Sequence, residues 1–207
     1  MCDDEAERLK CPYNFYMIDE VLRQVTGSMN QFFRTRFGLG EDVVVLSSLV
    51  NHDGTPAVLQ DNKIVATLLN IEPEKLTTTT GGKFAGGGRT SSVNAPVFIN
   101  LHVLFSGHFP GSNYAEALRF ISGVIAFFQA NVTMQRNDSA AQPPEMDKLT
   151  FDMQKFTYLE LNQVWGMLGA KHMPSVCYRI RLLSISENQL REQRPSVSNV
   201  EPDMNRV

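Results

Sequence analysis

Two kinds of apolar repeat alternate along the chain, and their order constrains the fold more than any other feature of the sequence. Spacings of three and four residues predict a helix, whereas alternation or a run of β-branched residues predicts a strand. The patterns follow the order α-β-β-β-α-β-α-β. Because the early connections resemble hairpins and the later ones are helix crossovers, we expect an α+β layer fold, with a mixed β-sheet of about five strands flanked by two long helices and one short helix.

The first long helix is expected over residues 13–37, and Gly38 and Gly40 end it. Its apolar residues recur every three or four positions, which places them on one stripe of the helix. The members of this stripe are Ile18, Leu22, Val25, Met29 and Phe32.

Capping residues predict where the other two helices begin. Asn113 with Glu116 indicates a capping box at the start of the second long helix, and Thr157 with Glu160 indicates one at the start of the short helix, which Gly169 closes. The expected buried stripe of the second long helix consists of Leu118, Ile121, Ile125 and Phe128.

Strand signals occupy segments between these helices. In residues 95–107, Val97, Ile99, Leu101, Val103 and Phe105 share one face, which is wholly apolar. The complete set of expected strands is 43–50, 63–72, 95–107, 148–156 and 175–185.

The patterns also divide the chain. Residues 1–12 are expected to be a flexible leader, and residues 13–185 a single α+β domain. Within that domain, residues 76–94 and 134–147 are expected to be mobile loops. Residues 186–207 are polar with two prolines and are expected to be a flexible C-terminal tail.

Phenylalanine residues number 13, and two pairs of them are adjacent in the expected helices: Phe32-Phe33 and Phe127-Phe128. Neighbours on a helix project about 100° apart, so both members of a pair cannot face one narrow core. A wide core beneath a broad helix-sheet contact explains the pairs. The alternative is that Phe33 or Phe127 lies in a subunit interface, where aromatic residues are enriched.

Composition restricts the class of function. The formal net charge of −3 and the pI near 5.8 do not favour nucleic-acid binding or binding to a membrane surface. The cysteines Cys2, Cys11 and Cys177 are too few and scattered for a disulfide framework or a structural zinc site. The N-terminus is acidic, not a secretion signal, and no apolar run reaches the ~20 residues of a membrane span, so we expect a chain that is cytoplasmic at synthesis.

The segment TTTTGGKFAGGGRTSS, residues 77–92, has the composition of a phosphate-binding loop but not its context. Lys83 is followed by Phe84 instead of Ser or Thr, and the segment that includes Arg89 leads into a strand, not a helix N-terminus. The pattern of a dinucleotide-binding loop is not satisfied either. We expect a long mobile connection between two strands, with a hinge or the tip of a binding surface as the alternative.

The sequence contains no convincing catalytic or metal-binding set. His52, His102, His108 and His172 lack the spacing of metal ligands. Cys177 falls in an expected core strand and should be inert. His52 and Asp53 with Ser47 or Ser48 could form a hydrolase set, but no nucleophile elbow presents either serine. We therefore expect no catalytic, cofactor-binding or metal-binding residue.

Four stretches of the chain resemble one family in order: residues 17–51, 63–72, 96–129 and 148–185. The first reads MIDEVLRQVTGSMNQFFRTRFGLGEDVVVLSSLVN. Together they resemble the cap, or tail-terminator, proteins of phage-tail-like contractile injection systems, the last gene product of the antifeeding-prophage and Photorhabdus virulence cassette clusters. Residues 77–92 and the tail after Ile185 lie outside this resemblance.

The resemblance implies a structural role. Proteins of this family form a hexameric ring on the distal end of the inner tube, contact the last layer of the sheath and stop polymerisation. It therefore implies that the partners of this chain are its own copies, the inner tube protein and the sheath protein, in a particle that is released or anchored. Residues 77–92, residues 136–147 and the C-terminal tail are candidate arms that add to a neighbouring sheet.

Two other classes of function remain open at this stage. One is a small ligand-binding or regulatory domain that uses residues 77–92 as a lid. The other is an enzyme whose site is assembled from His52, Asp53 and a serine. A saturable thermal shift with a metabolite library would favour the first, and hydrolytic activity lost in His52→Ala would favour the second.

Overall fold

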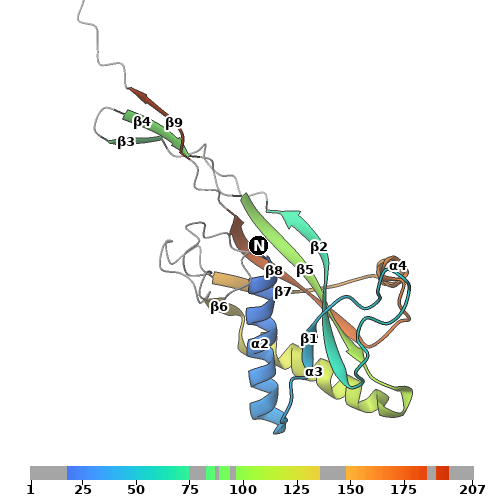
Figure 1. Cartoon of the computed structure of the whole chain (residues 1–207). Helices are drawn as coiled ribbons and strands as arrows, with labels where there is room; N and C mark the ends of the chain where they lie inside the picture. Colours follow the sequence, from blue (N-terminus) through green and yellow to red (C-terminus); the bar gives the residue numbers. More distant parts are fainter. Residues whose placement is uncertain are drawn as a thin grey trace, which may run out of the picture. The chain divides into compact units, whose positions relative to one another are not determined.

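The computed structural model describes residues 18–74, 83–86, 89–93, 97–135, 148–185 and 190–195 (Figure 1). The chain divides into two compact units. The larger unit comprises residues 16–74 and 98–183, and the smaller unit comprises residues 1–15, 75–97 and 184–207. The expected leader, residues 1–12, lies outside the described residues, as do residues 136–147.

The larger unit is built on a mixed six-stranded sheet with the order β1-β2-β5-β8-β7-β6 (Figure 1). β1 pairs with β2 in parallel, while the pairs β2-β5, β7-β8 and β6-β7 are antiparallel. The strands are β1 Val44–Leu46, β2 Lys63–Pro73, β5 Val97–His108, β6 Thr133–Gln135, β7 Lys148–Gln154 and β8 Ser175–Ile185.

The mixed α+β architecture is confirmed, but the sheet has six strands and not about five. The strand missed from the sequence is β6, whose three residues, Thr133, Met134 and Gln135, are too few to show alternation. β6 pairs with the start of β7, from Lys148 to Thr150, and this partner could not be read from a local pattern. Met134 and Gln135 therefore belong to the sheet, although a mobile loop was expected from residue 134.

Two long helices and one short helix accompany the sheet, as expected. They are α2 Ile18–Phe37, α3 Tyr114–Ala130 and α4 Tyr158–Leu168, with a single 3-10 turn, η1 Gly111–Asn113, before α3. Gly38 follows α2 with a φ of 66°, which favours glycine and agrees with its expected role as a helix stop.

The two predicted capping boxes have different outcomes. At α4, the Thr157 hydroxyl accepts from the Glu160 N–H and the Glu160 carboxylate accepts from the Thr157 N–H, so this box is confirmed. The Asn113 box is wrong, because the Asn113 side chain makes no capping bond. It donates instead to Asn62 Oδ1 at 3.2 Å, and its backbone, φ −110° and ψ 24°, is not extended as a capping residue requires.

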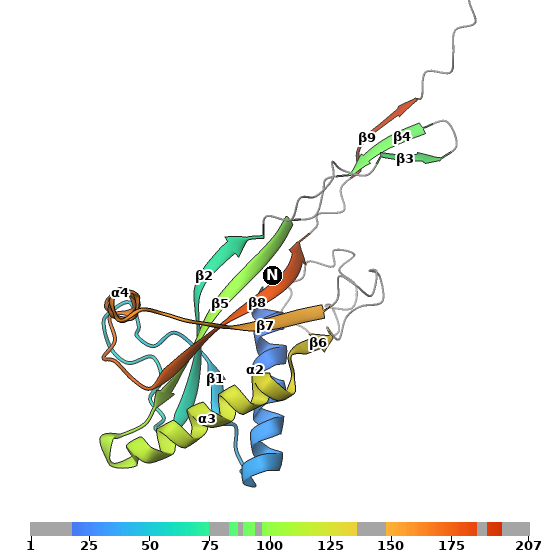
Figure 2. The same cartoon turned by 180° about the vertical axis from the view of Figure 1, so that it is seen from behind.

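Figure 2 shows α3 running across the sheet. An aromatic core joins α3 to the sheet on one side and to α2 on the other. The Phe128 ring lies 4.0 Å from that of Tyr178 and 5.3 Å from that of Phe105, centroid to centroid, which attaches α3 to β5 and β8. Phe33 of α2 meets Phe120 of α3 edge to face at 5.7 Å. The helices therefore contact each other and the sheet through phenylalanine rings.

This core settles the question raised by the phenylalanine pairs. Phe33, Phe127 and Phe128 are all buried, which confirms the wide core and rules out an interface role for Phe33 or Phe127. The predicted helical stripes are confirmed at Leu22, Val25, Met29, Ile121 and Phe128, all of which are buried, but Phe33 is more buried than Phe32 and Leu118 is exposed. The reason is that α3 buries a broader face, which includes Ala117, Phe120, Ile121, Val124, Phe127 and Phe128.

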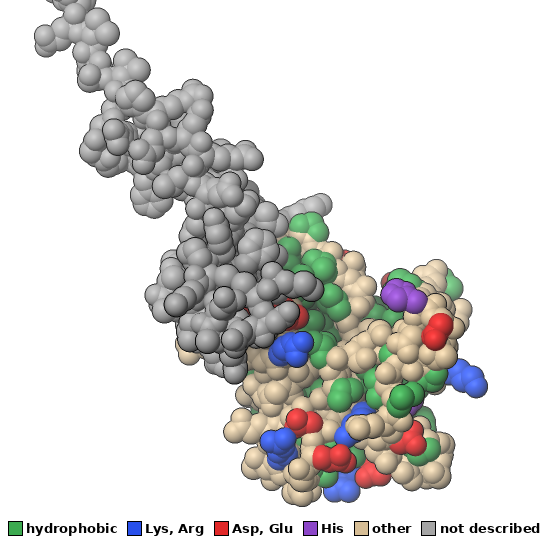
Figure 3. Space-filling view, viewed as in Figure 1, with side chains coloured by type: hydrophobic (Ala, Val, Ile, Leu, Met, Phe, Trp, Pro, Cys, Tyr) green, Lys and Arg blue, Asp and Glu red, His purple; other side chains and the backbone are tan. Residues whose placement is uncertain are grey.

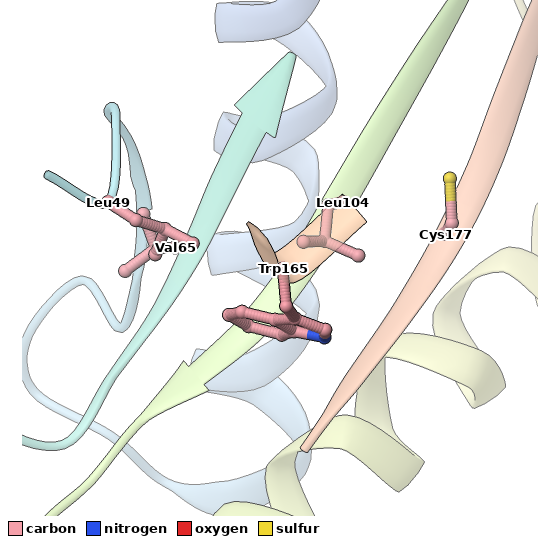
Figure 4. Packing of buried hydrophobic residues seen from close by; sticks show 5 residues of the cluster. All are labelled: Leu49, Val65, Leu104, Trp165 and Cys177. Atoms are coloured by element: carbon pink, nitrogen blue, oxygen red, sulfur yellow. The ribbon is translucent and has the colours of Figure 1, made fainter. Parts of the chain in front are cut away.

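A second, smaller core covers part of the opposite face of the sheet (Figure 4). Trp165 of α4 lies in front of Val65, Leu104 and Cys177, which come from β2, β5 and β8. Leu49, in the segment after β1, completes the cluster. β5 therefore has buried residues on both faces, as expected of a central strand.

A buried asparagine connects α2 to the first strand. Asn30 donates from Nδ2 to the Val44 carbonyl at 2.8 Å, and its Oδ1 accepts from the N–H groups of Val43 and Val44 at 3.0 and 2.8 Å. The side chain thus satisfies three backbone groups that a short edge strand would otherwise leave unpaired.

The smaller unit contains a three-stranded antiparallel sheet with the order β3-β4-β9. Its strands are β3 Lys83–Gly86, β4 Arg89–Val93 and β9 Leu190–Pro195. These strands were not predicted, because the first two fall within residues 76–94, where a mobile loop was expected, and the third within residues 186–207, where a flexible tail was expected. Glycine, serine and charged residues give these strands no alternating apolar signal.

Candidate interaction surface

The residues considered for a hydrolase set are not assembled into one. Asp53 makes its hydrogen bonds within its own turn. Its carboxylate accepts from the Thr55 N–H at 2.9 Å and from the Thr55 hydroxyl at 2.6 Å. The Thr55 hydroxyl, followed by the Thr55 backbone N–H, lowers the pKa of Asp53. Among the described residues, no hydrogen bond joins His52 to Ser47 or Ser48. Among the described residues, these side chains therefore do not form a triad.

The other histidines lie in separate places. His102 Nε2 is 3.1 Å from a carboxylate oxygen of Glu72, His108 Nε2 is 3.9 Å from one of Asp61, and the His172 ring packs edge to face on Trp165. The described residues contain no group of three or more potential ligands that could hold a metal ion.

Cys177 is buried in the second core, and this burial raises the pKa of its thiol to about 12. The thiol is therefore protonated at neutral pH and unsuited to nucleophilic attack, as expected from its strand.

The glycine-rich segment is only partly described. Lys83 is the first residue of β3 and Arg89 the first of β4, in an antiparallel pair that joins Gly86 with Arg89. Neither strand precedes a helix N-terminus, so the structure agrees with the rejection of a phosphate loop. The remaining residues of 77–92, namely 77–82 and 87–88, lie outside the described residues.

A row of charged side chains crosses the sheet on the same face as the second core. Asp152 of β7 accepts from Arg179 at 3.3 Å and from Arg181 at 3.2 Å, both on β8. Arg181 also reaches Glu74 at 3.4 Å, and the Asn100 amide donates to the other oxygen of Glu74. The row thus links β7, β8 and β5 to the end of β2.

The electrostatics of this row are balanced. The Asn100 hydrogen bond, and after it the charge of Arg181, lowers the pKa of Glu74, so the carboxylate is charged over a wide pH range. Both arginines are matched by carboxylates, and the row therefore differs from the unpaired basic clusters that bind phosphate or nucleic acid. On the side of the molecule seen in Figure 3, groups of both signs are likewise interspersed.

The two edges of the six-stranded sheet are short. β1 and β6 have three residues each, and short edge strands are one way in which proteins avoid uncontrolled pairing with other chains. β1 covers only Ile64–Ala66 of the eleven-residue strand β2. Among the described residues, the second half of β2 consequently forms a free edge of the sheet.

Large apolar side chains are exposed on α4 and in the loop before β2. Tyr158 is 94% exposed, and Leu59, in the loop before β2, is 89% exposed. Leu159 and Met167 of α4 are also exposed, while Trp165 alone of this helix is buried. α4 therefore presents an apolar surface that the described part of the chain does not cover.

Sequence reasoning missed the free half of β2 and the charged row. The row joins strands that lie up to 107 residues apart, as between Glu74 and Arg181, so no local pattern shows it. The alternation of Asn70, Glu72 and Glu74 was a usable signal, since it indicates a polar face at the end of the strand.

Comparison with solved structures shows that this fold has known examples. The "PVC sheath/tube terminator in extended state" of an extracellular contractile injection system aligns with a TM-score of 0.60 and 17% identity, over 94% of this chain and 65% of that one. The "anti-feeding prophage cap (AFP tube terminating cap)" aligns with a TM-score of 0.57 and 18% identity, over 92% of this chain and 62% of that one. The chain therefore spans less than two thirds of the length of both proteins.

The described helices include none that is long and apolar enough to cross a bilayer. No curated protein matches this chain. A family model does, over residues 20–199, and it describes the Pvc16 N-terminal domain. This match includes nearly all of α2, together with α3, α4, the six-stranded sheet and the three strands of the smaller unit. The chain thus belongs to the Pvc16 N-terminal domain family.

Proposed function

We propose that this chain is a structural cap that closes the distal end of the inner tube and sheath of a contractile injection system. The observation that carries the proposal is the shared fold over 94% of the chain with a protein described as a sheath/tube terminator. A cap of this kind ends polymerisation and so fixes the length of the particle. Its partners are further copies of itself in a hexameric ring, the inner tube protein and the sheath protein.

The edges of the large sheet support this role physically. A growing tube offers its terminal ring as a template for the next ring, and a terminator must match that template on one side and offer none on the other. β1 and β6, of three residues each, give an incoming strand little to extend along the parts of β2 and β7 that they cover. The balanced charges around Asp152 and Arg181 avoid a single-sign surface that would attract polyanions.

The proposal describes a structural protein and not an enzyme. It is favoured by the failure of His52, Asp53 and the neighbouring serines to form a triad among the described residues, and by the inert environment of Cys177. The protein acts as part of an assembled phage-tail-like particle, which is released or anchored, and is synthesised in the cytoplasm.

A strain that makes every other particle protein but lacks this chain tests the proposal. Electron microscopy of purified particles should show tubes of variable and greater length with open distal ends, and expression of the chain in trans should restore a single length. Gly27→Ala, a change on an exposed helix surface with no atom within 4 Å of the added methyl group, is a matched control that should also restore it. Particles of normal length and normal distal ends without the chain would refute the proposal.

A further inference from the structure

The free half of β2 combines unpaired backbone with a distinctive set of side chains. β1 ends opposite Ala66, and among the described strands only β5 pairs with β2 beyond that point. Figures 1 and 2 show the second half of β2 with β5 on one side and no strand on the other. A row of peptide groups is therefore open to an additional strand.

The register identifies which peptide groups point outward. Glu74 donates its N–H to the Phe98 carbonyl of β5, so Glu72 and Asn70, at alternate positions, also direct their peptide groups toward β5. Ile71 and Pro73 then direct theirs away from β5. Ile71 offers one N–H and one carbonyl to a new strand, while Pro73 offers a carbonyl alone.

A β-bulge sets the side chains of this edge. The register shifts between Leu68 and Asn70, which leaves Leu69 unpaired and lets it pack on the second core. After the bulge, Asn70 pairs with His102 and Glu72 with Asn100, so their side chains belong to the polar face of the sheet. Ile71, which is 45% exposed, lies on the opposite face.

Glu72 is the carboxylate at this edge that contacts His102 and Asn70 but no lysine or arginine among the described residues. Its carboxylate lies 3.1 Å from His102 Nε2 and its side chain is 49% exposed. Glu74, by contrast, is paired with Arg181. A strand placed beside β2 would bring its own side chains within about 5 Å of Glu72 on one face and of Ile71 on the other.

We propose that the edge of β2 from Leu68 to Pro73 is an acceptor site for an extended segment of a partner protein, whose side chains alternate between basic and apolar. Main-chain hydrogen bonds to Ile71 and Pro73 supply part of the affinity, and alternate side chains supply the specificity. A lysine or arginine of the added strand neutralises Glu72, and an apolar residue covers Ile71. This inference goes beyond the proposed cap function, because it rests on the exposed backbone and side chains of β2 and not on the role of the chain in a particle.

A partner protein fits this site better than a second copy of the chain. Among the described strands, the one that alternates basic and apolar residues is β8, with Arg179, Ile180 and Arg181, but β8 is held between β5 and β7. The edge strands β1 and β6 contain no basic residue. The sequence of β9, LREQRP, does not keep an alternation of basic and apolar residues.

A labelled peptide and the full chain test the proposal. The probe is a seven-residue peptide of alternating valine and lysine with a fluorescent label, and fluorescence anisotropy measures its binding. Saturable binding is expected for the wild-type chain. Ile71→Pro should weaken binding by about tenfold or more, since it removes one hydrogen-bond donor and obstructs the approach of a strand. Ile71→Val keeps the N–H and is the matched control that should bind like the wild type.

The Ile71→Pro variant remains informative because the N–H it loses points out of the sheet and has no partner among the described residues. Circular dichroism and thermal unfolding check that it folds. A peptide with glutamate in place of lysine should not bind, and Glu72→Gln should weaken binding of the lysine peptide. Failure of the wild type to bind, or equal binding by Ile71→Pro, would overturn the proposal.

Analytical ultracentrifugation of the chain without peptide distinguishes the two possible occupants of this edge, a partner protein and a second copy of the chain. Self-association that Ile71→Pro abolishes would replace the partner protein by a second copy, and the proposal as stated would be wrong. A monomer, or self-association that Ile71→Pro does not change, agrees with it. Because these measurements use no particle, their outcome is independent of the deletion strain that tests the cap function.

Discussion

Gly123 of α3 allows the two long helices to approach each other, and replacing it is a sharp test of the aromatic core. A methyl group at this position would lie 2.4 Å from Cε1 of Phe33, and 3.2 Å from ring atoms of Phe33 and Phe37. Phe33 is only 1% exposed and is surrounded by other rings, so it has little room to move away. Gly123→Ala should therefore destabilise the protein.

Two opposing effects determine the size of the change. Alanine is favoured over glycine inside a helix by about 1 kcal/mol. Forcing a methyl group into a packed core costs about 1–3 kcal/mol, and the 2.4 Å approach to Phe33 places Gly123→Ala at the upper end of that range. We expect a net loss of about 1–2 kcal/mol in the free energy of unfolding, which corresponds to a fall in Tm of about 2–8 °C for a domain of this size.

Urea denaturation followed by circular dichroism measures the difference. Gly27→Ala in α2 and Gly166→Ala in α4 are the controls, because no atom lies within 4 Å of either added methyl group. Both should stabilise the protein by up to about 1 kcal/mol. The double variant Gly123→Ala/Phe33→Leu should lose less free energy of unfolding than the sum of the two single variants, because the smaller leucine side chain relieves the clash. A Gly123→Ala protein as stable as the wild type would refute this account of the helix contact.

Further predictions concern a buried amide, a carboxylate and a thiol. Asn30→Ala should lower the free energy of unfolding by about 3 kcal/mol in urea denaturation, because buried peptide groups beside β1 lose their partners. The pKa of Glu74 is lowered in the folded state, so its carboxylate stabilises the fold fully above the ordinary pKa of 4.5, and this stabilisation is lost as the pH falls through the folded-state pKa. Glu74→Gln should therefore show a smaller fall in Tm below pH 4.5 than the wild type. With Cys2 and Cys11 replaced by serine, Cys177 should react with a thiol reagent at pH 8 only after unfolding, and rapid labelling of the native protein would contradict its burial.

Local signals in the sequence were sufficient where a short segment determines its own structure. The Thr157 and Glu160 box closes within one turn, and Gly169, with a φ of 64°, ends the same helix, so both could be read directly. The long strand β5 was also clear, because its alternation continues over many residues. The mixed α+β architecture followed from the order of such segments.

Predictions failed where a distant residue decides the outcome. Asn113 has the right residue type and spacing for a helix cap, yet its side chain donates a hydrogen bond to Asn62, 51 residues earlier, instead. Leu118 fits a narrow stripe, but the sheet accepts a broad face of α3 and leaves it exposed. The free edge of β2 depends on how far β1 extends and on the bulge at Leu69, and neither has a signal in the sequence.

The limited burial of α4 has a consequence for local unfolding of this protein. Trp165 is the one fully buried side chain of α4, with Leu161 and Leu168 partly buried beside it, whereas α3 packs through a row of buried phenylalanine rings. We expect the short helix to detach and return many times before the layer formed by α2 and α3 loosens, so its amide hydrogens should exchange with solvent earlier. The exposed surface of a helix that detaches locally can adjust to a neighbouring protein while α2, α3 and the sheet keep their structure.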